Sequence, residues 1–105
     1  MKTTPAKESP TRLASVHPGR ILKKEILEAR ALSQTQLAAA TGLPVSRIND
    51  LVKERRGITV DSAIRLSKAL GTSVDLWLNL QRAFDLEEAQ RLKGEEYQRI
   101  TPLAA

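Results

Sequence analysis

Apolar side chains recur at helical spacing through most of this chain, and no segment shows the strict alternation that is typical of a β-strand. The first apolar face follows His17-Pro18-Gly19, where proline suits the first helical position, and it comprises Ile21, Leu22, Ile26 and Leu27. Four more helices are expected, with starts near Ser33, Val45, Thr59 and Ser73 and ends near Thr41, Lys53 or Glu54, Gly71 and Leu92. The pattern therefore predicts an all-α protein of five helices.

Three glycines, Gly42, Gly71 and Gly94, mark predicted helix ends. Gly42 supplies the left-handed turn between the second and third helices, a conformation that a residue with a Cβ resists. Gly94 is expected to stop the last helix. At the N-terminus of the second helix, Ser33 and Gln36 have the spacing of a capping box, which favours a helix start at Ser33.

The last predicted helix is apolar over more of its circumference than one packing interface needs. At about 100° per residue its apolar side chains sweep an arc of roughly 200°, against the ~100° stripe of a helix packed on one side. We therefore expect one face to lie on its own domain and the other on a second copy, through Leu76, Trp77, Leu80 and Phe84. A helix buried deeply within a monomer is the alternative.

The segment from Ser33 to Arg56 has the layout of a helix-turn-helix, whose second helix lies in the major groove of DNA. Its apolar positions can form a wedge between the two helices, and Ala38 is small where the helices cross. The wedge residues are Leu37, Leu43, Ile48 and Leu51. An αα-corner in an unrelated helical bundle is the alternative.

Docking geometry gives the exposed residues of this motif their expected roles, because the start of the second helix reaches base edges. The expected base contacts are Pro44, Val45, Ser46, Arg47, Asn49 and Asp50. Val45 can pack on a thymine methyl, Arg47 can bind guanine or a phosphate, and Asn49 can pair with adenine. Asp50 either accepts from a cytosine amino group or forms an ion pair with Arg47 or Lys53.

Phosphate contacts are expected on both sides of that helix. Ser33, Gln34 and Thr35 open the preceding helix with polar side chains and free backbone N–H groups. Lys53, Arg55 and Arg56 follow it with positive charge, although a charge run of this kind can also be merely solvated. The predicted organisation is a flexible arm at 1–15, a helix-turn-helix DNA-binding domain with its dimerisation helix at 16–92, and a flexible tail at 93–105.

Composition supports a nucleic-acid partner. The 105 residues carry a net charge of +5, and the surplus lies in residues 1–60, with 11 Lys/Arg against 5 Asp/Glu. Residues 61–105 carry 6 against 7. The chain has no cysteine, no apolar run near the ~18 residues that span a bilayer and no secretory h-region, which together predict a cytoplasmic protein without membrane contact.

The motif and its flanks resemble the phage-repressor-like (XRE) helix-turn-helix family, and within it the HigA-type antitoxins. The resemblance rests on His17-Pro18-Gly19, Arg55-Arg56-Gly57-Ile58-Thr59, Leu70-Gly71-Thr72-Ser73 and Trp77-Leu78-Asn79-Leu80-Gln81, and it extends from about His17 to Ala89. Family members usually carry an acidic residue after the His-Pro-Gly string, where this chain has Arg20.

The resemblance implies a phage-repressor-like five-helix domain with a C-terminal dimerisation helix. It further implies the antitoxin of a type II toxin–antitoxin system, which binds and neutralises a HigB-type toxin, a ribosome-dependent endoribonuclease. Such a homodimer also represses its own operon by binding double-stranded operator DNA, usually with the toxin as co-repressor. The alternative is a stand-alone XRE-family repressor of a phage or operon, with no toxin partner.

An enzyme is not expected. The sole histidine, His17, lies at a helix start, where capping or exposure is its expected role. The pairs Glu87-Glu88 and Glu95-Glu96 are adjacent in sequence and point to different sides of a helix, so they do not converge as an acid and a base. No metal-ligand cluster or glycine-rich phosphate loop is present, so no cofactor is predicted. A module that uses the groove helix for protein contacts is a further alternative.

Overall fold

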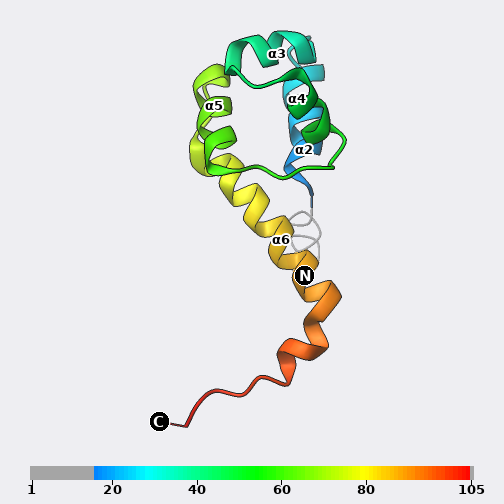
Figure 1. Ribbon diagram of the computed structural model, residues 1–105, viewed down its shortest axis with the longest axis vertical. Helices are drawn as coiled ribbons and strands as arrows, with labels where there is room; N and C mark the ends of the chain where they lie inside the picture. The colour runs from blue at the N-terminus through cyan, green and yellow to red at the C-terminus, as the bar shows by residue number, and fades with distance from the viewer. Residues whose placement is uncertain (1–15, 105) are drawn as a thin grey trace, which may run out of the picture.

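The computed structural model describes residues 16–104, and every regular element in that range is helical (Figure 1). The elements are α2 (Pro18–Ile21), η1 (Leu22–Glu28), α3 (Gln34–Thr41), α4 (Val45–Val52), α5 (Val60–Leu70) and α6 (Val74–Gln98). The predicted N-terminal arm, residues 1–15, lies outside the described residues. The all-α prediction is confirmed for the part of the chain that the structure describes.

The short helices pack together as a bundle, and α6 runs from this bundle outward to the C-terminal end (Figure 1). Fully buried side chains from every part of the bundle meet in one core, where α6 contributes Trp77. The largest of them are Leu22, Leu37, Ile48, Leu51, Leu66 and Trp77. None of the helices within residues 16–104 combines the length and apolar character that crossing a membrane requires.

The first predicted helix is present, but its geometry changes along its length. The α-helical turn Pro18–Ile21 continues without a break into the π-helical segment Leu22–Glu28. A π-helix closes its turns from residue i to i+5. The buried residues of this segment are Leu22, Ile26 and Leu27.

His17 starts this first helix as an N-cap, as the sequence predicts. Its Nδ1 accepts a hydrogen bond from the Gly19 backbone N–H at 2.8 Å, and its ring lies edge-on to Phe84 of α6, with 4.9 Å between ring centroids. Burial lowers the pKa of His17 below its usual 6.5, against the opposing effect of the Glu54 and Asp85 carboxylates. Gly19 itself passes so close to the Leu51 carbonyl of α4 that a side chain there would collide with it.

The predicted boundaries of α3, α4 and α5 are confirmed to within a residue or two. Ser33 and Thr59 each form a capping box, with Gln36 and Ser62 respectively, and Ser73 caps α6 through the Leu76 N–H. Gly42 takes the expected left-handed conformation, with φ 77°. These local signals therefore determined where the helices of the bundle begin and end.

Two predictions for the last helix are wrong. Gly94 does not end it, because α6 continues to Gln98 across a local kink at Lys93, where φ is −129°. One glycine costs a helix only about 1 kcal/mol relative to alanine, and the residues around it favour helix. Trp77 does not face a second copy: its side chain is fully buried, and its Nε1 donates to the Thr72 hydroxyl at 2.8 Å. The first turns of α6 pack on their own domain, which encloses the indole.

Candidate nucleic-acid interface

Helix α4 presents a polar face to solvent because its apolar residues hold the opposite face in the core. Ile48 and Leu51 are fully buried and lie ~60° apart at about 100° per residue. The side chains on the other side are exposed or half-buried: Val45, Ser46, Asn49 and Asp50. Pro44 forms the exposed N-cap position, and Arg47 lies half-buried at the edge between the two faces. The predicted base contacts therefore share one accessible edge, with Arg47 at its margin.

The start of α3 is close to this face. The Ser33 hydroxyl accepts from the Gln36 N–H at 3.0 Å, and the Gln36 side chain accepts from the Ser33 N–H at 2.8 Å. This box leaves the first-turn N–H groups of Gln34 and Thr35 directed out of the helix start, where an anion can bind. The Gln34 side-chain oxygen accepts from Asn49 Nδ2 at 3.2 Å, which links α3 directly to α4.

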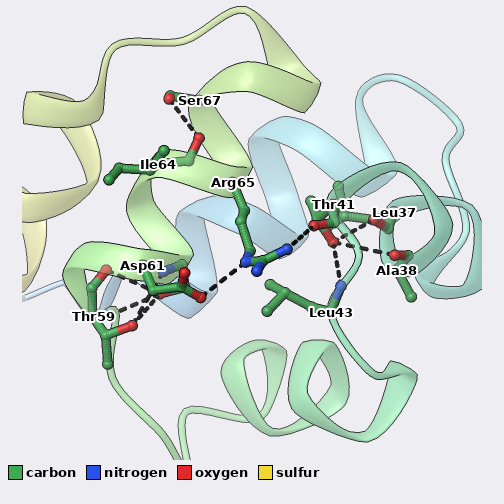
Figure 2. Close-up of polar contacts among 10 residues, drawn as sticks. Leu37, Ala38, Thr41, Leu43, Thr59, Asp61, Ile64, Arg65 and Ser67 are labelled. Atoms are coloured by element: carbon green, nitrogen blue, oxygen red, sulfur yellow. Dashed lines mark hydrogen bonds and ion pairs between the residues drawn. The ribbon is translucent and has the colours of Figure 1, made fainter.

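The corner between α3 and α4 is held from outside the motif by Arg65 of α5 (Figure 2). Arg65 donates to the Thr41 carbonyl at 2.9 Å and to Asp61 at 2.9 Å. The Thr41 hydroxyl in turn accepts from the Leu43 N–H at 3.2 Å. Sequence reasoning missed Arg65, because its spacing from Asp61 indicates only a helical ion pair and its partner in α3 is 24 residues away.

The chain folds back after α4 through a left-handed residue. Glu54 has a φ of 61°, its N–H bonds to the Leu51 carbonyl at 3.0 Å, and the Arg55 N–H bonds to the Asp50 carbonyl at 2.8 Å. These two bonds form a Schellman motif with glutamate in the place usually taken by glycine. Arg20 of α2 lies 3.5 Å from the Glu54 carboxylate. Arg20 therefore pairs with an acidic residue of the turn that follows α4.

This turn directs the three basic residues differently. Lys53, Arg55 and Arg56 are all exposed, but the Arg55 side chain bends back over the last turn of α4. Its guanidinium contacts Asp50 Oδ1 at 3.0 Å through Nη2 and at 3.3 Å through Nε, and Asn49 Oδ1 at 3.3 Å through Nη2. The ion pair predicted for Asp50 therefore exists, but its partner is Arg55 and not Arg47 or Lys53. The Schellman turn, which sequence reasoning did not foresee, brings the two together.

Gln81 of α6 fixes the loop that follows. Its Oε1 accepts from the Ile58 N–H at 2.6 Å, and its Nε2 donates to Asp85 at 2.9 Å. The basic turn is thus anchored at its far end to the helix that was predicted to dimerise. In the sequence Gln81 appears only as the last residue of the Trp77-Leu78-Asn79-Leu80-Gln81 string, and nothing there indicates a bond to Ile58, 23 residues away.

The accessible apolar surface of α6 only partly matches the predicted dimer face. Leu76 is 38 % exposed, Leu80 is half-buried against the core, and Phe84 is half-buried beside His17. An open groove of about 440 Å³ also runs along α6, lined by Ile58, Leu78, Gln81, Arg82, Asp85 and Leu86. Leu86, which the prediction did not include, is 58 % exposed.

Comparisons with known proteins match the chain to helix-turn-helix proteins, antitoxins among them. Residues 23–77 match the helix-turn-helix family model. Virulence-associated protein I of Dichelobacter nodosus is 44 % identical over 81 residues, which are 77 % of this chain and 75 % of that protein. Antitoxin HigA-1 of Vibrio cholerae is 33 % identical over 93 residues, covering 89 % and 88 %. The structure of Pseudomonas aeruginosa antitoxin HigA with the higBA promoter superposes with a TM-score of 0.81 at 38 % identity, covering 86 % of this chain and 99 % of that one.

Proposed function

The chain belongs to the XRE-type helix-turn-helix family, in which its relatives and structural neighbours include HigA antitoxins, and on this premise we propose that it is the antitoxin of a type II toxin–antitoxin system. As a homodimer it represses its own operon by inserting α4 into the major groove of operator DNA. It neutralises a HigB-type endoribonuclease by direct binding in the cytoplasm. The accessible polar edge of α4, rigidly backed by Ile48 and Leu51, is the observation that carries the DNA-binding part.

We assign the base contacts to the exposed edge of α4. Val45 is 44 % exposed and suits a thymine methyl, and Asn49 suits adenine. Pro44, Ser46 and Arg47 complete the edge that enters the groove. Because Arg47 lies at the margin of this edge, its guanidinium can bind either a guanine or a phosphate.

The phosphate contacts flank that edge. Ser33, Gln34 and Thr35 approach one phosphate through the start of α3, and Lys53 and Arg56 approach the backbone after α4. Each neutralised phosphate releases counterions, so operator affinity is expected to fall steeply with salt.

The homodimer brings two such edges to one duplex, and we assign this whole unit to residues 16–92. Leu76, Leu80 and Phe84 remain the proposed contacts, and the exposed Leu86 extends them along the groove on α6. A two-fold axis that places the two α4 helices ~34 Å apart matches one turn of DNA and predicts a palindromic operator.

Gel retardation of the chain's own promoter fragment tests the DNA-binding proposal. The double variant Arg47→Glu, Ser46→Ala should abolish the shifted band while the far-UV circular dichroism stays unchanged. The control is Arg99→Glu, which reverses a charge at the exposed end of α6, far along the chain from α4, and should shift the fragment like the wild type. Normal retardation by the double variant would contradict the assignment of α4.

Co-expression tests the toxin-binding proposal. The small protein encoded beside this chain should arrest growth when expressed alone, and growth should resume when both are expressed. The two proteins should also co-purify. Operator binding without rescue or co-purification would instead identify a stand-alone repressor.

A further inference from the structure

The side chains at the centre of the α4 edge form a connected network, and Arg55 is the residue that closes it. Gln34 accepts from Asn49 Nδ2, Asn49 Oδ1 accepts from Arg55, and Arg55 also pairs with Asp50. The network therefore joins the start of α3, the middle of α4 and the turn after α4.

This network fixes the orientation of the Asn49 amide. An unconstrained amide can exchange the places of its oxygen and nitrogen by rotating about its last side-chain torsion. Here the nitrogen faces an acceptor on Gln34, and the oxygen faces a donor on Arg55, so the flipped amide would oppose like groups on both sides. One N–H and one lone pair of Asn49 remain, which is the pair that adenine engages through N7 and N6.

The backbone holds Arg55 in this place independently of its side chain. The left-handed Glu54 and the bond from the Arg55 N–H to the Asp50 carbonyl fold the chain back over α4. The guanidinium also lies 3.0 Å from Asp50 Oδ1, where it offsets a negative charge that would otherwise face the DNA phosphates.

We propose that Arg55, together with Gln34, is a positioning residue that determines base specificity through Asn49, and not the phosphate contact that its sequence position predicts. The inference rests on the proposed DNA-binding function. Gln34 has a double role in this arrangement, because its amide nitrogen remains available to a phosphate while its oxygen orients Asn49.

Arg56 is a matched control for Arg55. It has the same side chain and is the next residue in the same exposed turn, but no side-chain hydrogen bond or ion pair engages it within residues 16–104. Arg55 is itself 57 % exposed in its side chain, so its replacement should leave the fold intact.

The experiment uses duplex DNA selected by the wild-type protein from a library with a randomised core. Binding to the selected duplex and to its single-base substitutions is then measured by fluorescence anisotropy over a range of salt concentrations. Arg56→Gln should weaken binding by a similar factor on every duplex and reduce the salt slope by about 1. Arg55→Gln should leave the salt slope near that of the wild type. At one A·T pair of each half-site, the wild type should prefer the selected base pair over a substituted one by about ten-fold or more in affinity. Arg55→Gln should reduce this preference to about a few-fold.

Gln34→Ala provides a second test, because it should relax specificity at the same base pair as Arg55→Gln. Uniform loss by Arg55→Gln, with a salt slope like that of Arg56→Gln, would overturn the positioning role while leaving the proposed function standing. Failure of the wild type to select any sequence would overturn the proposed function and this inference with it.

Discussion

Replacing Gly42 by alanine probes how the recognition helix is held at its angle, and Gly71 offers a matched control. Both glycines end a helix in the left-handed conformation, with φ values of 77° and 75°. An alanine Cβ in that conformation costs about 1–2 kcal/mol at either site. The surroundings differ, because the added Cβ would have nothing within 4 Å at Gly71 but would lie 2.9 Å from Arg65 Nη1 at Gly42.

The extra cost at Gly42 follows from what Arg65 does there. Displacing its guanidinium loses the bond to the Thr41 carbonyl, which measures 2.9 Å. Because the Arg65 side chain is 43 % exposed, we take the lower half of the usual range for a hydrogen bond, about 0.5–1 kcal/mol. Gly42→Ala should therefore destabilise by about 1.5–3 kcal/mol and Gly71→Ala by about 1–2 kcal/mol.

Urea denaturation measures both variants, with the fluorescence of the single, buried Trp77 as the signal. The difference between the two should vanish when both are made in an Arg65→Ala background, since the cycle isolates the clash with Arg65. Operator affinity should fall for Gly42→Ala, whose turn sets the angle of α4, and stay unchanged for Gly71→Ala. Equal losses of stability and equal affinities for the two variants would refute this account of the corner.

Three further outcomes are expected. Trp77→Phe should lower the free energy of unfolding by about 1–3 kcal/mol in urea monitored by circular dichroism, because it loses the bond to Thr72 and part of the core volume, yet leave the mass in light scattering unchanged. Burial lowers the pKa of His17 in the folded state, so the unfolded state binds more protons and stability should fall as pH drops below 6.5. In His17→Asn the dependence of the unfolding free energy on pH should flatten between about pH 7.5 and 5.5. An unchanged dependence would assign it to other titratable groups. Leu86→Glu should weaken dimerisation more than ten-fold, as measured by analytical ultracentrifugation. The control Leu103→Glu, at a residue 96 % exposed on the C-terminal segment, should have no effect. A Leu86→Glu protein as dimeric as the wild type would exclude Leu86 from the interface.

The sequence by itself determined where α3, α4 and α5 begin and end. Ser33 and Thr59 act within three residues of themselves, and Gly42 acts through its own φ, so these signals are local and visible in the chain. The alternation of apolar and polar positions around α4 likewise identified Ile48 and Leu51 as its buried side. Family membership followed from the helix-turn-helix motif and from short contiguous strings in its flanks, such as His17-Pro18-Gly19, which can be recognised in the sequence alone.

Only the tertiary structure decided how the candidate interface is organised. Arg65 reaches α3 from 24 residues away, and the Asn49–Gln34 bond joins residues 15 apart, distances at which no periodicity applies. Trp77 was assigned to a second copy because a wide apolar arc fits a partner and a core equally well, and packing within the domain settled it. Arg55 differs from Arg56 for the same reason. The sequence shows that both side chains are positively charged, but where each one points depends on a backbone turn that forms only when α4 is folded.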